Sequence, residues 1–216
     1  MIYIDNIYVS GWKPAIRGCR NPLNSWDRMD SEFLWYPEHG DEPMLGNNDL
    51  GLCLRLVKAG TEHRKFLRMI HISMDIKAPA YWVAEHDTYK ISTTRNSCSF
   101  MHKGITEKFT KDDFNFFENT TKEFDNTADN IIETLNNLRD LFFKTKDYNY
   151  FIMIRNLLPQ GYMIKYTWDC NMETLLNIIC QRKGHRLPEW ETFRQKMFEN
   201  VPYLLEFYEV LQKENN

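Results

Sequence analysis

The chain has 216 residues, of which 43% are hydrophobic and 14% aromatic, enough apolar material for a buried core and too much for a disordered tail. Lys and Arg number 27 against 30 Asp and Glu, a formal net charge of −3, which argues against a protein that binds duplex nucleic acid through a basic face. There is no basic leader, no apolar run of membrane-spanning length, and the five cysteines are scattered without Cys-x-x-Cys spacing. These properties predict a cytoplasmic protein of one domain over residues 1–216, with neither nucleic-acid nor membrane partners.

The N-terminal part, residues 1–48, is predicted to be rich in loops. Residues 1–9 have the character of a strand. Residues 11–48 combine Pro, Gly, Trp and Asn, a composition that predicts a short helix within long loops. Asp49 is then predicted to N-cap a helix that stops near Gly60.

The middle of the chain combines a strand, a loop and a long helix. Residues 69–76 alternate apolar with polar side chains, which predicts a half-buried strand. A short aromatic helix is expected after Pro79, followed by a polar, functional loop over residues 88–102. Residues 112–144 carry apolar side chains at helical spacing and predict a long helix.

The C-terminal part continues with a helix that ends near Pro159 and a strand over residues 162–169. A helix is predicted to open at Asn171, and residues 190–212 predict a last helical region. A few strands among long helices indicate a mixed α/β or α+β domain.

One segment has an unusual order of motifs. A helix ends in Arg155-Asn156-Leu157-Leu158-Pro159, a strand follows, and the next helix opens on Asn171, has Asn177 six residues later and ends at Arg182. Beyond it stands Glu189-Trp190-Glu191. This order resembles the C-terminal half of the flavin-dependent thymidylate synthases, which carry Ala-Arg-x-x-Leu-Pro, a strand, Asn-x-Arg-x-x-x-Asn, a later Arg and Gln-Trp-Glu. The resemblance implies an α+β fold with a central, mostly antiparallel sheet and long helices, assembled as a homotetramer.

The resemblance extends upstream to about Asp49. Glu85 falls where the family has a Gln that touches the nucleotide, and Asn96-Ser97-Cys98-Ser99 falls near the family's Asn-Glu-x-Ser. Thr88-Tyr89-Lys90 stands in the place of the family's Arg-His-Arg motif. This chain therefore departs from the family at its most recognisable motif, which puts catalysis in doubt more than the fold.

Two further departures are complementary in charge. Lys65 and Arg68 stand where the family has a Thr and a Glu that contact the flavin, and Glu173 stands where it has an Arg. If the two places face each other, the chain keeps an ion pair with reversed polarity. The alternative is unrelated drift in a protein that no longer holds flavin.

The resemblance assigns the nucleotide to two arginines, Arg155 and Arg182, with Arg182 as the predicted catalytic residue. A guanidinium suits both a phosphate and a pyrimidine edge, because it is always charged and donates in a planar fork. The alternative for each arginine is a surface salt bridge. The predicted substrate-binding residues are Arg155, Arg182, Glu85, Asn96, Ser97 and Ser99.

The flavin is assigned by the same matches. Tyr89 could stack on a ring or merely pack a loop, and Asn171 could be only a helix N-cap. Glu173, Asn177 and Gln181 form a polar stripe, which is either a solvated helix face or, as the resemblance implies, the wall of a cleft between subunits. The predicted cofactor-binding residues are Lys65, Arg68, Thr88, Tyr89, Lys90, Asn171, Glu173 and Asn177.

These matches predict transfer of a one-carbon unit to C5 of dUMP or a related pyrimidine nucleotide, with FAD as cofactor and with NADPH and methylenetetrahydrofolate as co-substrates. The alternative is a nucleotide-binding relative that has lost flavin. A third possibility, an interaction protein, rests on aromatic residues such as Trp26 and Trp35 in the loops. Cys98 and His102 have a spacing that could suit a metal, but no third ligand joins them, so no metal is predicted.

Overall fold

The structure, a computed structural model of the chain, describes residues 1–100, 104–116 and 120–213. The chain divides into two compact units. The first unit comprises Met1, Lys77–His86 and Ser97–Tyr166, and the second comprises Ile2–Ile76, Asp87–Asn96 and Thr167–Asn216. That residues 1–216 form one domain stays a prediction.

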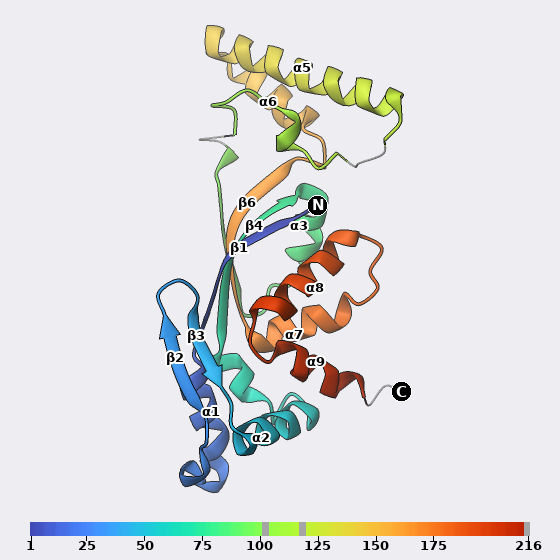
Figure 1. The fold of residues 1–216 in the computed structure, drawn as a ribbon. Helices are drawn as coiled ribbons and strands as arrows, with labels where there is room; N and C mark the ends of the chain where they lie inside the picture. The colour runs from blue at the N-terminus through green and yellow to red at the C-terminus, as the bar shows by residue number, and fades with distance from the viewer. Residues whose placement is uncertain (101–103, 117–119, 214–216) are drawn as a thin grey trace. The chain divides into compact units, whose positions relative to one another are not determined.

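The strands of the described residues form a six-stranded sheet in the order β2-β3-β1-β4-β6-β5 (Figure 1). β2 and β3 form an antiparallel hairpin, and β1 runs parallel to β3. The sheet is mostly antiparallel and is combined with long helices, which confirms the predicted fold class. The strands are β1 Tyr3–Ser10, β2 Glu32–Tyr36, β3 Gly40–Met44, β4 His71–Pro79, β5 Thr93–Ser97 and β6 Met163–Asn171.

The helices of the second unit include α7, α8 and α9, which gather beside the sheet (Figure 1). Short 3₁₀ turns occur at η1 Asn21–Leu23, η2 Trp26–Arg28, η3 Lys65–Met69 and η4 Lys111–Asp113. The α-helices are α1 Trp12–Arg20, α2 Asn47–Lys58, α3 Ala80–His86, α5 Lys122–Thr145, α6 Tyr148–Leu157, α7 Met172–Gln181, α8 Pro188–Asn200 and α9 Leu204–Gln212.

The core of the second unit follows the predicted apolar patterns. Alternate residues of β4 are buried, as the alternation over residues 69–76 predicts. The apolar face of α7 is also buried and includes Leu175 and Ile179, both with no exposed surface. Burying such a side chain contributes about 1.5–3 kcal/mol each, so this face fixes the orientation of α7 and turns its polar stripe away from the core.

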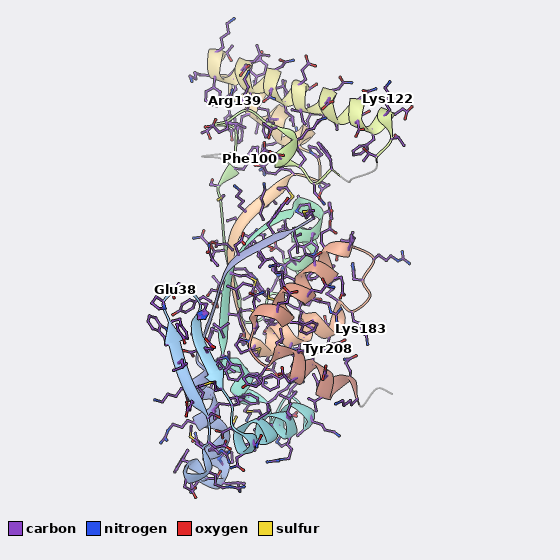
Figure 2. The ribbon with its side chains drawn as sticks, viewed as in Figure 1. Glu38, Phe100, Lys122, Arg139, Lys183 and Tyr208 are labelled. Carbon is purple, nitrogen blue, oxygen red and sulfur yellow. The ribbon has the colours of Figure 1, made fainter. Side chains whose placement is uncertain are left out.

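The core of the first unit is half aromatic and includes residues of α5 and α6. Its buried members are Ile105, Phe109, Phe114, Leu135, Phe151 and Ile154. Arg139 on α5 (Figure 2) donates hydrogen bonds to the carbonyl oxygens of Ile105 at 2.9 Å, Thr106 at 2.6 Å and Glu107 at 3.0 Å. These bonds hold the segment before the core phenylalanines against α5.

The N-terminal part contains a hairpin where long loops were predicted. β2 and β3 pair from Glu32–Met44 to Tyr36–Gly40, and Glu38 lies in the turn between them (Figure 2). Gly40 has φ 84°, and a Cβ there would come within 2.0 Å of the carbonyl oxygen of Val9, so the turn requires glycine. β2 is exposed except at the half-buried Phe33. Its sequence is apolar at four successive positions, 33–36, and therefore lacks the alternation by which a strand is recognised.

The predicted N-cap of α2 was wrong. Asp49 lies inside the first turn of the helix, and its carboxylate accepts a hydrogen bond from Arg20 Nε at 2.9 Å. The cap is supplied from a distant residue, Asp30, whose carboxylate accepts from the backbone N–H groups of Asn48 at 2.9 Å and Asp49 at 3.0 Å. These contacts lower the pKa of Asp30, with the bond from Asn48 as the largest cause.

Three other predicted boundaries shift. The loop over residues 88–102 contains strand β5 at the edge of the sheet. The long helix begins at Lys122 rather than at residue 112, because the Thr121 hydroxyl accepts from the N–H of Phe124 at 3.2 Å and caps it there. The last helical region is two helices, separated near Tyr203, which has a left-handed backbone with φ 60°.

Candidate functional site

A cavity of about 450 Å³ lies within the second unit. Three segments form its walls: residues 88–92, which follow α3; η3; and the polar face of α7. Its size falls within the range of small-molecule sites, which is roughly 300–1,000 Å³. The lining residues are Arg68, Thr88, Tyr89, Lys90, Ile91, Ser92, Asn171, Glu173, Thr174, Asn177 and Gln181.

The start of α7 supplies one wall. Asn171 is its N-cap, since the side-chain oxygen accepts from the N–H of Thr174 at 2.9 Å, and the same residue lines the cavity. Glu173, Asn177 and Gln181 follow at four-residue spacing and also line the cavity. The predicted polar stripe is therefore the wall of a cavity, and Asn171 both caps the helix and belongs to that wall.

Two arginines from the segment around η3 bind the carboxylate of Glu173. Arg64 Nε donates to Glu173 Oε1 at 3.1 Å, and Arg68 Nε donates to the other carboxylate oxygen, Oε2. Arg64 also donates to the side-chain oxygen of Asn177 at 3.3 Å, and Arg68 to the carbonyl oxygen of Thr61 at 3.1 Å. The hydrogen bond to Glu173 raises the pKa of Arg68. The contact between Arg68 and Glu173 that the reversed-polarity hypothesis required is confirmed.

Two of the three charged side chains in this cluster, those of Arg64 and Glu173, are largely buried. Glu173 is 8% exposed and Arg64 8%, so each charge needs its partner. Glu173 also lies in the first turn of α7, where the positive end of the helix dipole favours a carboxylate. Among the lining residues Arg68 and Lys90 are positive and Glu173 is negative, which leaves a formal charge of +1 for an anionic ligand.

Residues 88–92 are held in place by side chains of the same unit. The Thr93 hydroxyl donates to the carbonyl oxygen of Tyr89 at 2.8 Å, and the Thr174 hydroxyl donates to that of Ile91 at 3.0 Å. Ser92 has a left-handed backbone with φ 55°, which is uncommon for a residue other than glycine. The segment is therefore fixed both to its own continuation and to α7.

Arg182 is the C-cap residue of α7 and lies against two aromatic side chains. Its Nε donates to the Tyr89 hydroxyl at 2.8 Å. Its guanidinium carbon lies 5.2 Å from the centre of the Tyr89 ring and 4.4 Å from that of Trp190, within the range of cation–π interactions. Nη1 lies 3.0 Å from His185 Nε2. The guanidinium is thus held on several sides rather than extended into solvent.

The predicted cofactor residues all lie in the second unit, whereas the predicted substrate residues are divided between the two units. All the predicted cofactor residues except Lys65 line the cavity; Lys65 is exposed on η3. Arg182 and the exposed Asn96 belong to the second unit. The predicted substrate residues of the first unit are Arg155, Glu85, Ser97 and Ser99.

In the first unit these residues lie on several elements. Arg155 is exposed near the end of α6, with its guanidinium carbon 4.8 Å from the centre of the Phe100 ring. Glu85 is half-buried on α3, Ser97 ends β5, and Ser99 is exposed. Their part in substrate binding stays a prediction.

Sequence reasoning missed Arg64. Its partner Glu173 lies 109 residues away, and no spacing within the motifs pointed to it. A lone arginine in a polar segment carries no signal that it will be buried. Only its approach to α7 identifies it.

The described residues contain neither a metal centre nor a helix that could span a membrane. Across residues 1–100, 104–116 and 120–213, no three His, Cys, Asp or Glu side chains are grouped so that they could hold a metal ion. His102, considered above with Cys98, lies outside the described residues. No helix in the described part of the chain has the length and apolar character needed to cross a membrane.

The chain matches no protein-family model, and no curated protein matches it in sequence. Solved structures do match it. Thymidylate Synthase X (ThyX) from Helicobacter pylori, in a structure with FAD and dUMP, aligns with a TM-score of 0.72 at 15% identity, over 98% of this chain and 99% of that one. The UMP/dUMP methylase PolB from Streptomyces cacaoi, bound with 5-Br dUMP, aligns with a TM-score of 0.64 at 14% identity, over 99% of this chain and 95% of that one.

The chain has the fold of these enzymes. Both alignments run over nearly the whole of each chain, so the likeness is not confined to the C-terminal motifs.

Proposed function

We propose that the protein is a divergent relative of the flavin-dependent thymidylate synthases, which transfers a one-carbon unit to C5 of dUMP or a related pyrimidine nucleotide. The observation that carries the proposal is the cavity of the second unit. Three separate segments of the chain match positions that contact the flavin in the family that the sequence resembles. Residues from all three line this one cavity. The fold shared with ThyX and PolB supports it.

The lining of the cavity fits the ring system and one phosphate of a flavin. Tyr89 offers an aromatic face, and the amides of Asn171 and Asn177 offer the donors and acceptors that a heterocycle edge requires. Lys90 can meet a phosphate as a point charge. A bound flavin would supply the hydride that completes the transfer, while these side chains bind and orient it.

Arg182 is the proposed contact to the pyrimidine base. Its guanidinium donates hydrogen bonds in a planar fork, and its position is set by Tyr89 and Trp190. A fixed guanidinium beside a base carbonyl would stabilise the negative charge that develops on that oxygen, so that the ring can react at C5 as an enolate. From the resemblance, we also propose that NADPH and methylenetetrahydrofolate are co-substrates. The protein would be a homotetramer in the cytoplasm.

A second candidate is a nucleotide-binding relative without flavin. Arg68, at the place of a flavin-contacting residue, is occupied with Glu173 and the carbonyl oxygen of Thr61. The net charge of +1 on the lining is also small for a dinucleotide with two phosphates. On this view the cavity accepts a smaller ligand with one phosphate.

The test is a titration of the purified full chain with FAD, followed by flavin fluorescence, with and without dUMP. Saturable binding is expected, and Lys90→Gln should weaken it up to about fivefold, because Lys90 is exposed and an exposed ion pair contributes at most about 1 kcal/mol. Lys196→Gln, an exposed lysine on α8 of the same unit, is the matched control. Binding of dUMP without any binding of FAD would favour the second candidate, and binding of neither would reject both.

A further inference from the structure

Tyr89 takes part in two environments at once. It lines the cavity together with the rest of residues 88–92. Its hydroxyl also accepts the Nε–H of Arg182 at 2.8 Å, and its ring lies against the same guanidinium. Arg182 is not among the residues that line the cavity, so Tyr89 connects the cavity with a cation beside it.

Tyr89 is held in place both on the side of the cavity and on the side of Arg182. The Tyr89 carbonyl oxygen is held by Thr93, and the segment is held to α7 by Thr174. At the other end, Trp190 packs on the guanidinium and makes an edge-on contact with the Tyr89 ring, with 6.2 Å between the ring centres. A displacement of residues 88–92 by a ligand therefore moves the acceptor of the Arg182 Nε–H.

We propose that Tyr89 is a positioning residue that sets the orientation of Arg182 and couples ligand binding in the cavity to nucleotide binding at Arg182. This inference rests on the proposed function, because it takes Arg182 as the contact to the base. A ligand in the cavity that contacts Tyr89 shifts its hydroxyl and thereby brings Arg182, which donates to that hydroxyl, into the orientation that binds the base. By linkage, a nucleotide at Arg182 strengthens binding in the cavity by the same factor.

The variant that isolates this role is Tyr89→Phe, which keeps the ring against the guanidinium and removes only the hydroxyl. Its matched control is Tyr208→Phe on α9 (Figure 2). The Tyr208 ring also lies against a guanidinium of the same unit, with 5.4 Å between the Arg194 guanidinium carbon and the ring centre. Both substitutions retain an aromatic side chain of nearly equal volume, so both variants are expected to fold.

The binding experiment is calorimetric titration of the full chain with dUMP, with and without saturating FAD. In the wild type, FAD is expected to tighten dUMP binding at least about fivefold, the lower end of typical coupling. Tyr89→Phe should weaken dUMP binding about tenfold, as expected for loss of one hydrogen bond to a charged group, and should abolish the effect of FAD. In an Arg182→Ala background the same substitution should have no further effect.

A second measurement needs no ligand. The Arg182 Nε–H signal, followed by NMR in ¹⁵N-labelled protein, should exchange slowly with water in the wild type and in Tyr208→Phe. In Tyr89→Phe the exchange should be clearly faster, because the acceptor is lost.

The outcomes separate the two proposals. If the wild type binds dUMP and FAD but Tyr89→Phe retains full affinity and coupling, the positioning role is overturned and the proposed function stands. If the wild type binds neither ligand, the proposed function fails and the coupling with it. Unchanged exchange of the Arg182 Nε–H in Tyr89→Phe would by itself overturn the role of Tyr89.

Discussion

Replacing Glu173 by Gln is expected to destabilise the second unit by about 3 kcal/mol, the lower end of the cost of breaking a buried ion pair. Gln has nearly the same shape as Glu, so the substitution removes charge without creating a cavity. The buried guanidinium of Arg64 then keeps only neutral acceptors, the new side-chain oxygen and that of Asn177 at 3.3 Å. Because those acceptors remain, we expect the lower end of the range.

The two arginines that bind Glu173 should differ in their contributions. Arg64 is buried, whereas the side chain of Arg68 is 48% exposed, although both bind the same carboxylate. Exposed pairs contribute little, because water and salt screen the attraction and ordering the side chain costs entropy. Double-mutant cycles should therefore give a much larger coupling free energy between Arg64 and Glu173 than between Arg68 and Glu173.

The assay is urea unfolding followed by tryptophan fluorescence. Of the six tryptophans in the chain, all except Trp82 belong to the second unit, so the signal reports mainly on the unit that contains the ion pairs. Glu199→Gln, an exposed carboxylate on α8, is the control and should change the stability by no more than about 0.5 kcal/mol. A loss below about 1 kcal/mol for Glu173→Gln, or equal effects of Arg64→Met and Arg68→Met, would refute the argument from burial.

Three other outcomes follow from the structure. Asn171→Ala removes the oxygen that accepts from the Thr174 N–H and should cost about 1 kcal/mol, measured in the same urea assay. The Thr167 hydroxyl, at 2.5 Å, is the largest cause of a lowered pKa at Asp75. The stabilisation from that carboxylate is therefore present above its unfolded pKa of about 3.9 and is lost as the pH falls through the lower folded value, so the stability difference between wild type and Asp75→Asn should shrink below about pH 4. Leu135→Ala, at a fully buried position of the first unit, should cost about 2–5 kcal/mol, seen as faster hydrogen exchange of the amides in α5.

Much of the fold could be predicted because the signal was local. The alternation in β4 and the apolar face of α7 repeat with the period of their own element, and both are buried as expected. The hairpin β2–β3 was missed because β2 is a largely exposed edge strand, whose sequence need not alternate. The N-cap of α2 was misassigned because its acceptor, Asp30, lies 18 and 19 residues before the N–H groups that it binds.

In the candidate site too, the residues that belong to motifs could be predicted, whereas contacts between distant residues could not. The motif order placed Thr88-Tyr89-Lys90, Asn171, Glu173 and Asn177 as cofactor residues, and the structure brings all of them to one cavity. The contact between Arg68 and Glu173 was one of two alternatives and required only that two matched places face each other, which they do. Arg64 and the enclosure of Arg182 by Tyr89 and Trp190 could not be found in this way.

The sequence by itself determined the periodic elements, the α+β class and the residue types available for a nucleotide and a flavin. Each of these depends on neighbours a few positions apart, where backbone geometry fixes which side chains share a face. Only the tertiary structure decided which charges are buried and which partners they meet. Burial and pairing depend on contacts across about a hundred residues of sequence, such as Arg64 with Glu173 and Tyr89 with Arg182, and chain connectivity alone does not constrain separations of that length.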